Sequence, residues 1–199
     1  MRVLMINYEY PPVGGGTANA NYYFIRELAK HSDVTVDLIT VKPHPGTLIE
    51  NFSENVRLHK IGIHKGDPHH WTGSEMLEWC LRSHFYLKKL LRGNTYDICH
   101  CWNGWPPGFF GYLYRKKMPY VIALRGNDVP GYEIRFRLLE KIVLSDLSRA
   151  IWKHAATVTA NSKELAELAQ NTLRCRIAII PNGVDTDEFH PKHYGQIRT

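Results

Sequence analysis

The stretch that decides the fold is Tyr8-Glu9-Tyr10-Pro11-Pro12-Val13-Gly14-Gly15-Gly16-Thr17. An apolar run, Val3-Leu4-Met5-Ile6, precedes it, and residues 18–30 have the pattern of a helix. The prolines stiffen the turn, and the glycines let another molecule approach bare backbone. A helix beginning at Thr17 directs its unpaired N–H groups and positive dipole end into the same space. The stretch therefore predicts an anion or phosphate site, or else a tight turn that binds nothing.

The composition is typical of one soluble globular domain. The chain has 199 residues, of which 44% are hydrophobic and 22% are charged. Its net charge of +6 suits acidic small molecules, an anionic membrane face or nucleic acid. No apolar run reaches membrane-spanning length, and the first residues lack the pattern of a signal peptide. We therefore expect a cytoplasmic protein.

The cysteines do not have the spacing of a metal site. Cys99 and Cys101 flank His100 inside an apolar strand, and no second closely spaced pair of ligands accompanies them. We expect small buried thiols, no metal ion and no bound cofactor.

Segments with the patterns of strands and helices alternate along the chain. We expect strands at residues 2–7, 33–41, 56–63, 97–102, 119–124, 156–160 and 176–180. We expect helices at residues 17–31, 72–92, 106–117, 132–153 and 162–171, and a long loop at residues 42–55. This alternation predicts an α/β fold with a Rossmann-like, doubly wound, mostly parallel sheet of about seven strands.

The helix expected at residues 72–92 has both a start signal and an apolar face. Thr72 and Glu75 have the spacing of a capping box. The side chains expected against the sheet are Leu77, Cys80, Leu81, His84, Leu87 and Leu91.

Ligands of doubly wound folds bind beyond the carboxyl ends of the strands. The loops at residues 8–16, 103–107 and 125–131 follow three of the expected strands and should meet at that rim. They are also the most chemically unusual stretches of the chain, so we expect the site there. The chain has no P-loop and no nucleophile elbow. An incomplete GxGxxG pattern disfavours a dinucleotide dehydrogenase.

These residues resemble the family-4 glycosyltransferases, retaining enzymes of the GT-B fold. The segment Tyr10-Pro11-Pro12-Val13-Gly14-Gly15-Gly16 is similar to the opening loop of that family, and Asp97-Ile98-Cys99-His100 to one of its strands. Pro181-Asn182-Gly183-Val184-Asp185, followed by Phe189-His190-Pro191, resembles the exit toward a second domain. The resemblance implies a Rossmann-like acceptor-side domain at residues 1–180. It also implies a linker at residues 181–199, leading toward a C-terminal donor-binding domain.

The resemblance implies an enzymatic function for the full-length protein. It would move a sugar from a nucleotide-diphosphate sugar, its co-substrate, to the hydroxyl of a glycan, a lipid-linked molecule or a small molecule. The isolated domain should be inactive, because half of the cleft is missing. The alternative is a non-catalytic α/β module that binds a phosphorylated metabolite.

The resemblance also assigns residues to the donor side of the site. The backbone N–H groups of Gly14, Gly15 and Gly16 would contact the donor diphosphate. Arg125 stands where the family often has a histidine, and as a candidate catalytic residue it would donate hydrogen bonds to an anion. Alternatively, Arg125 pairs with Asp128 and holds its loop. His100, the other candidate catalytic residue, is either a general base or a hydrogen-bonded residue at a strand end.

The candidate acceptor contacts are Asn103, Trp105, Asn127 and Asp128, because hydroxyl-rich ligands need polar groups beside an aromatic face. Trp105 alternatively packs in the core or in a lid. The basic segments at residues 115–117 and 135–137 are solvated helix faces, or they attract anionic lipid at the inner face of the membrane. No nucleic-acid-binding motif is present.

Overall fold

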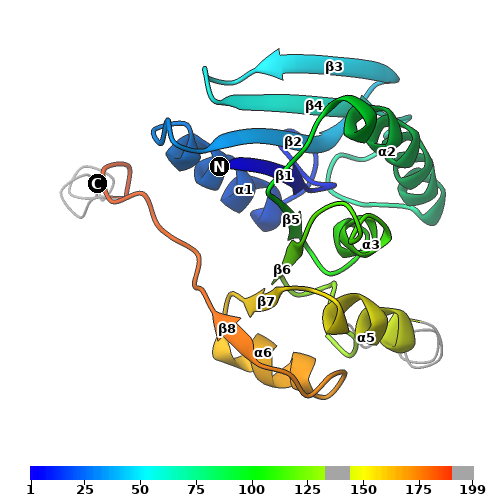
Figure 1. Ribbon diagram of the computed structural model, residues 1–199, viewed down its shortest axis with the longest axis vertical. Helices are drawn as coiled ribbons and strands as arrows, with labels where there is room; N and C mark the ends of the chain where they lie inside the picture. Colours follow the sequence, from blue (N-terminus) through cyan, green and yellow to red (C-terminus); the bar gives the residue numbers. More distant parts are fainter. Residues whose placement is uncertain (133–143, 190–199) are drawn as a thin grey trace, which may run out of the picture.

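In the computed structural model, which describes residues 1–132 and 144–189, one eight-stranded sheet organises the chain (Figure 1). The strand order is β3-β4-β2-β1-β5-β6-β7-β8, and every neighbouring pair is parallel except β3 with β4. The strands are β1 (Arg2–Ile6), β2 (Thr35–Lys42), β3 (Gly46–Asn51), β4 (Val56–Gly62), β5 (Ile98–Trp102), β6 (Tyr120–Leu124), β7 (Thr157–Ala160) and β8 (Ile177–Ile179). The predicted Rossmann-like α/β class is therefore confirmed.

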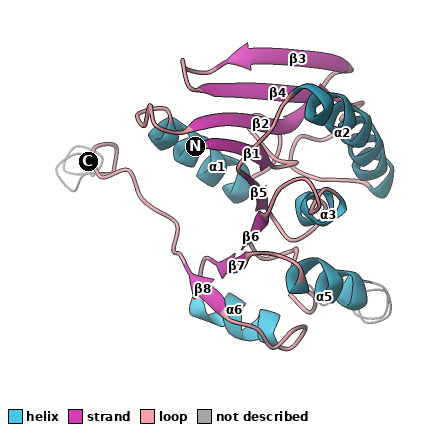
Figure 2. Ribbon diagram, in the orientation of Figure 1, coloured by secondary structure: helices cyan, strands magenta, loops and turns pink. Residues whose placement is uncertain are grey.

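The helices cover both faces of the sheet (Figure 2). α1 (Gly16–Leu28) packs on one face, where Ile25 joins Met5 and Leu38 in a buried cluster. The opposite face carries α2 (Gly73–Gly93), α3 (Pro107–Leu113), α5 (Ser145–Lys153) and α6 (Lys163–Gln170). The chain adds strands on one side of β1 and then on the other. Because each crossover is right-handed, the helices of the two halves must lie on opposite faces of the sheet. None of the described helices has the length and apolarity needed to cross a bilayer.

The prediction of a long loop at residues 42–55 is wrong. Residues Gly46–Asn51 form β3, which pairs antiparallel with β4 at the edge of the sheet. Leu48 and Ile49 are about half exposed, so the strand lacks the buried alternation by which strands are recognised. Its register places Glu50 near Lys60, and their side chains form an ion pair at 2.7 Å.

The predicted inner face of α2 is also partly wrong. Leu87 and Leu91 are buried as expected, but Leu77 and Leu81 are 59% and 52% exposed. The helix is rotated because Trp79, which is fully buried, takes the central position on the sheet. Its indole Nε1 donates to the carbonyl of Thr40 at 3.5 Å.

Two helix starts agree with the sequence. The Glu75 N–H donates to Thr72 Oγ1 at 3.3 Å and the Thr72 N–H to Glu75 Oε2 at 2.8 Å, which confirms the capping box. Ser162 Oγ accepts from the Leu165 N–H at 3.1 Å and caps α6. Of the expected helix at residues 132–153, residues 133–143 lie outside the described part, and α5 begins at Ser145. Residues 135–137 and the end of the expected linker, residues 190–199, lie outside the described part.

Candidate functional site at the carboxyl edge of the sheet

β1 lies at the topological switch point of the sheet. Its neighbours are β2, which is reached through α1 on one face, and β5, which is reached through α2 on the other. Loops that leave such a point diverge and open a crevice for a ligand. The stretch from Tyr8 to Gly16 therefore occupies the position where open α/β sheets bind their ligands.

The three consecutive glycines have different surroundings. Gly14 has φ +104°, and a Cβ there would lie 2.8 Å from the Cβ of Glu9 and 3.0 Å from that of Ala18. A Cβ at Gly15 or Gly16 would meet nothing within 4 Å. Gly14 is thus needed for the shape of the turn, whereas Gly15 and Gly16 expose backbone to open space at the start of α1.

A carboxylate lies at this helix start. The Gly15 N–H lies near the Glu9 carboxyl and lowers its pKa, but burial outweighs this effect and raises the pKa of Glu9 above its ordinary value. The Gly15 N–H can therefore donate to an anionic group, as N–H groups at helix N-termini generally do. A phosphate would compete with Glu9 for the same N–H group.

The loops after β5 and β6 are joined by one side chain. Asp128 Oδ2 accepts from the Gly104 N–H at 2.5 Å, and its Oδ1 accepts from the N–H groups of Arg125 and Gly126 at 2.9 and 2.8 Å. Burial raises the pKa of Asp128, although these backbone hydrogen bonds lower it. Asp128 also lies close enough to Tyr8 to contribute to the raised pKa of that phenol. The three predicted rim loops therefore meet.

Several donors at this rim are buried without an acceptor in the described part of the chain. They include Nδ2 of Asn7, Nδ2 of Asn103 and Nε of Arg125. Asn7 and Asn103 follow directly after β1 and β5 and are 0% and 3% exposed, and Asn103 has φ 109°. An unmet buried donor costs about 1–3 kcal/mol. Such a concentration of donors suits a ligand rich in acceptor oxygens.

Arg125 lies between the rim and the face of the sheet that carries α1. Its guanidinium stacks 3.6 Å from the ring centroid of Trp102, and Nη1 donates to Asn182 Oδ1 at 2.6 Å. Burial lowers the pKa of Arg125 to about 10, against the opposing effect of Asp128, so it is a cation at neutral pH. Asp128 binds the backbone N–H of Arg125, while the guanidinium bonds to Asn182.

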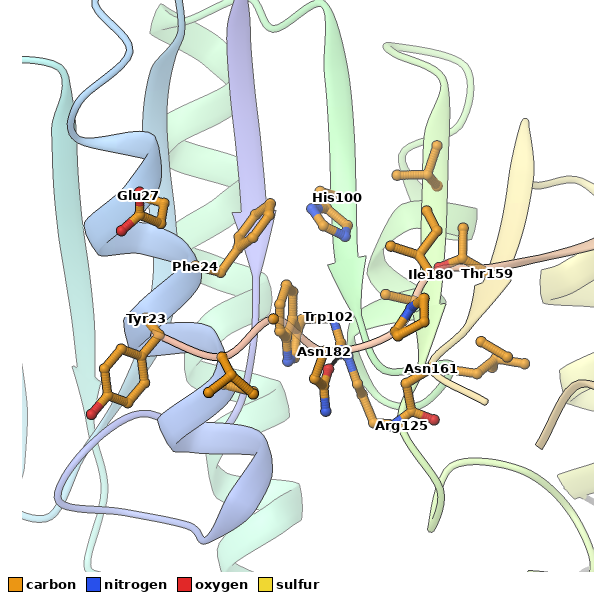
Figure 3. Close-up of a pocket in the computed structure, with 18 of the residues that line it drawn as sticks. Tyr23, Phe24, Glu27, His100, Trp102, Arg125, Thr159, Asn161, Ile180 and Asn182 are labelled. Atoms are coloured by element: carbon orange, nitrogen blue, oxygen red, sulfur yellow. Dashed lines mark hydrogen bonds between the residues drawn. The ribbon is translucent and has the colours of Figure 1, made fainter. Parts of the chain in front are cut away.

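His100 lies in the middle of β5 and faces α1, with the rings of Phe24 and Trp102 at centroid distances of 5.8 and 5.4 Å. Burial, helped by Arg125, lowers the pKa of His100 to about 4, so its imidazole is neutral at physiological pH. His100 and Arg125 line a cavity of about 580 Å³ between α1 and residues 180–185 (Figure 3).

The remaining predicted contacts differ in exposure. Trp105 is half-buried, with its ring 5.4 Å from that of Phe109, whereas Asn127 is exposed on the loop after β6. Within residues 1–132 and 144–189, no group of three or more His, Cys, Asp or Glu side chains is arranged to hold a metal ion.

A fourth loop, which the sequence motifs do not predict, lies at the rim. The loop between β4 and α2 contacts the glycine turn, since the Gly14 N–H donates to the Pro68 carbonyl at 2.8 Å. Tyr8 packs edge-to-face on Trp71 of the same loop, with 5.4 Å between ring centroids. The parallel direction of β4 was the available signal, because its carboxyl end must reach the same rim.

Comparison with known proteins gives the family. The sequence matches Glycosyltransferase Family 4 over residues 14–188, and the chain belongs to this family. The fold is that of the N-terminal, Rossmann-like domain of a GT-B glycosyltransferase, as the resemblance implied. No curated protein matches the sequence.

Three solved structures illustrate the likeness in fold. Sucrose-phosphate synthase from Thermosynechococcus elongatus superposes with a TM-score of 0.72 at 19% identity, over 96% of this chain and 50% of that chain. The E. coli trehalose-6-phosphate structure bound with UDP-2-fluoro glucose gives 0.58 at 11% identity, over 94% and 50%. An α,α-trehalose-phosphate synthase (UDP-forming) from Burkholderia vietnamiensis gives 0.55 at 13% identity, over 94% and 49%. The chain spans about half the length of these three structures.

Proposed function

We propose that the full-length protein is a retaining glycosyltransferase that moves a sugar from a nucleotide-diphosphate sugar to a hydroxyl acceptor. The acceptor would be a glycan, a lipid-linked molecule or a small molecule. The observation that carries this proposal is the open backbone of Gly15 and Gly16 at the start of α1 and at the switch point of the sheet. Family membership supports the transfer reaction. Retention of configuration rests on the family resemblance.

The proposed chemistry is electrostatic. Negative charge develops on the leaving diphosphate as the glycosidic bond to the donor breaks, and aligned N–H groups stabilise that charge. Gly15 and Gly16 supply such groups at the positive end of α1. Arg125 adds a cation at the end of β6. Gly14 forms the turn that places its two neighbours.

The acceptor would lie against the loops after β5 and β6. Asn103, Trp105 and Asn127 offer amide groups and an aromatic edge there, while Asp128 holds the two loops together. His100 is proposed as a neutral polar residue beside Arg125. Residues 181–199 are proposed to lead to the domain that binds most of the donor, and no cofactor or metal ion is assigned.

A donor screen tests the proposal. The full-length protein is incubated with a panel of nucleotide-diphosphate sugars, and release of the nucleoside diphosphate is measured with and without candidate hydroxyl acceptors. We expect acceptor-dependent release from one donor class. Tight binding of a phosphorylated metabolite with no transfer from any donor would instead favour the non-catalytic module.

The exposed face of α2 supports a second proposal, contact with an anionic membrane surface. Leu77, Leu81 and Phe85 follow one another at helical spacing and are 59%, 52% and 67% exposed. Lys88 and Arg92 continue the same row, and among the described residues no carboxylate forms an ion pair with them. An apolar stripe that ends in unpaired cations suits the boundary between acyl chains and anionic headgroups.

Vesicle sedimentation tests the membrane contact. The protein should sediment with vesicles that contain phosphatidylglycerol, and the double variant Leu81→Ser/Phe85→Ser should lose most of this binding. The matched control is Leu48→Ser/Ile49→Ser, because these side chains are similarly exposed on β3. Equal losses in both variants, or self-association through α2 without vesicle binding, would overturn the proposal.

A further inference from the structure

We propose that His69 is a positioning residue, which holds the peptide bond between Gly14 and Gly15 in the orientation that presents the glycine turn to the donor diphosphate. The inference rests on the proposed function of that turn. His69 lies in the loop between β4 and α2, which neither the family match nor the sequence motifs assign to the site.

Both polar backbone atoms of Gly14 bond to this loop. The Gly14 N–H donates to the carbonyl of Pro68 at 2.8 Å, and the Gly14 carbonyl accepts from Nδ1 of His69 at 3.1 Å. On the other side of the same peptide, the N–H of Gly15 lies near the carboxyl group of Glu9 and lowers its pKa. Two side chains therefore face this peptide, His69 at its oxygen and Glu9 at its nitrogen.

This double contact matters because the peptide lies between two glycines. Without a Cβ on either side, a rotation of the peptide plane meets little steric resistance. Such a rotation would turn the N–H of Gly15 away from the ligand and exchange it for a carbonyl oxygen, which repels phosphate. A hydrogen bond to the carbonyl opposes the rotation, and His69 supplies it.

The loop that carries His69 is itself well anchored. The N–H of His69 donates to Asp67 Oδ1 at 2.7 Å. Before it, the Gly66 N–H donates to Glu75 Oε1 at 2.8 Å. The buried side chain of Lys65 pairs with Glu75 Oε2 at 2.9 Å, and its ammonium lies 4.7 Å from the ring centroid of Trp71. The loop therefore links the start of α2 to the glycine turn and restricts the movement of His69.

The contact requires only that Nδ1 of His69 carries a proton, so that it can donate to the carbonyl oxygen. The Nδ1–H tautomer of the imidazole carries this proton, and the Gly14 carbonyl can only accept it. The amide nitrogen of an asparagine stands at nearly the same distance from the backbone as Nδ1. Asparagine should therefore replace His69, whereas leucine, of similar size to asparagine, cannot donate.

The test compares His69→Leu with His69→Asn in the full-length protein. UDP, GDP and ADP are titrated calorimetrically, the tightest binder is used for every variant, and the corresponding nucleoside is titrated in parallel. We expect about tenfold weaker diphosphate binding for the leucine variant, because the hydrogen bond that holds the Gly14 carbonyl is lost. We expect about twofold weaker binding for the asparagine variant. Nucleoside binding should not change in either variant.

The control variants separate this inference from the proposed function. His70→Ala removes the neighbouring exposed imidazole, whose Nδ1 contacts Asp67 at 2.9 Å, and should bind like the wild type. Gly16→Val should abolish diphosphate binding. If Gly16→Val weakens binding but the leucine and asparagine variants bind equally well, the role of His69 is overturned and the proposed function stands. Unchanged binding by Gly16→Val, or no binding by the wild type, overturns both.

Discussion

Gly14 and Gly16 lie in one turn, but they are glycines for different reasons. Gly14 has a positive φ, and a Cβ added there would lie too close to Glu9 and Ala18, so both its backbone conformation and its surroundings disfavour a side chain. Gly16 is the first residue of α1, and a Cβ there meets nothing. The first glycine is therefore a requirement of the fold, and the second is available for function.

Substitution by alanine should separate these roles. We expect Gly14→Ala to lower the free energy of unfolding by about 1–3 kcal/mol, because of the positive φ and the close Cβ contacts. Gly16→Ala should leave it unchanged or raise it by up to about 1 kcal/mol, because alanine favours a helix over glycine. Urea unfolding of the two variants measures the difference, and equal stabilities would contradict the description of the turn.

Asp37 is the centre of a buried polar network at the opposite end of the sheet. Its carboxylate accepts from Tyr96 Oη at 2.9 Å, bonds to Nε2 of His59 at 2.8 Å and pairs with Arg2 at 3.1 Å. Burial alone would raise the pKa of Asp37, but these partners outweigh it and lower the pKa to about 2. The carboxylate is 3% exposed, so solvent screens the network little.

The network predicts a specific loss of stability in acid. A depressed folded-state pKa stabilises the fold above the unfolded pKa of about 3.9, and this contribution, about 2 kcal/mol, is lost as the pH falls toward the folded value. Asp37→Asn should lack that contribution at neutral pH and should flatten the stability profile between about pH 4 and pH 2. Thermal melts across this range measure the effect. A variant with the same acid profile as the wild type would rule out Asp37 as its source.

At the scale of elements, α2 gives the sharpest test of packing. Its sequence contains two apolar rows, and the structure buries Trp79 and Leu87 while it exposes Leu77 and Leu81. We expect Leu87→Ala to cost about 2–5 kcal/mol, as a cavity in the core does, and Leu81→Ala less than about 0.5 kcal/mol. Chemical denaturation measures both. A larger loss for Leu81→Ala would show that the helix is rotated toward the sequence-based face.

The central elements could be predicted because their burial is unambiguous. β1 is an apolar run after Arg2, β5 has apolar residues on both sides of His100, and α6 and α2 begin at residues whose side chains cap them. Two features could not be predicted. The face of α2 depends on which large side chain fits the sheet, and β3 is an exposed edge strand with little apolar pattern.

The site was predictable in part for the same reasons. Glycines and prolines in the sequence predicted the loops after β1, β5 and β6, and Asp128 joins two of these loops. The loop after β4 contacts the turn through the carbonyl of Pro68 and the ring of His69, more than fifty residues from Gly14. Such long-range contacts leave no local pattern in the sequence.

At the scale of the whole molecule, the segment that follows β8 crosses the face that carries α1 (Figure 1). Asp185 pairs with Arg26, Asn182 accepts from Arg125, and Glu188 accepts from Tyr23 Oη at 2.9 Å. The residues that resemble the exit toward a second domain are thus tied to α1 and to the cation at the end of β6.

The central claim is that the start of α1 binds the donor diphosphate in the full-length transferase. The most direct measurement is kcat/KM for the donor with Gly16→Val, alongside its thermal unfolding midpoint. The account predicts a fall of about a hundredfold or more, as expected when donors to a developing anion are blocked, with the midpoint within a few degrees of the wild type. An unchanged kcat/KM in a folded variant would contradict it.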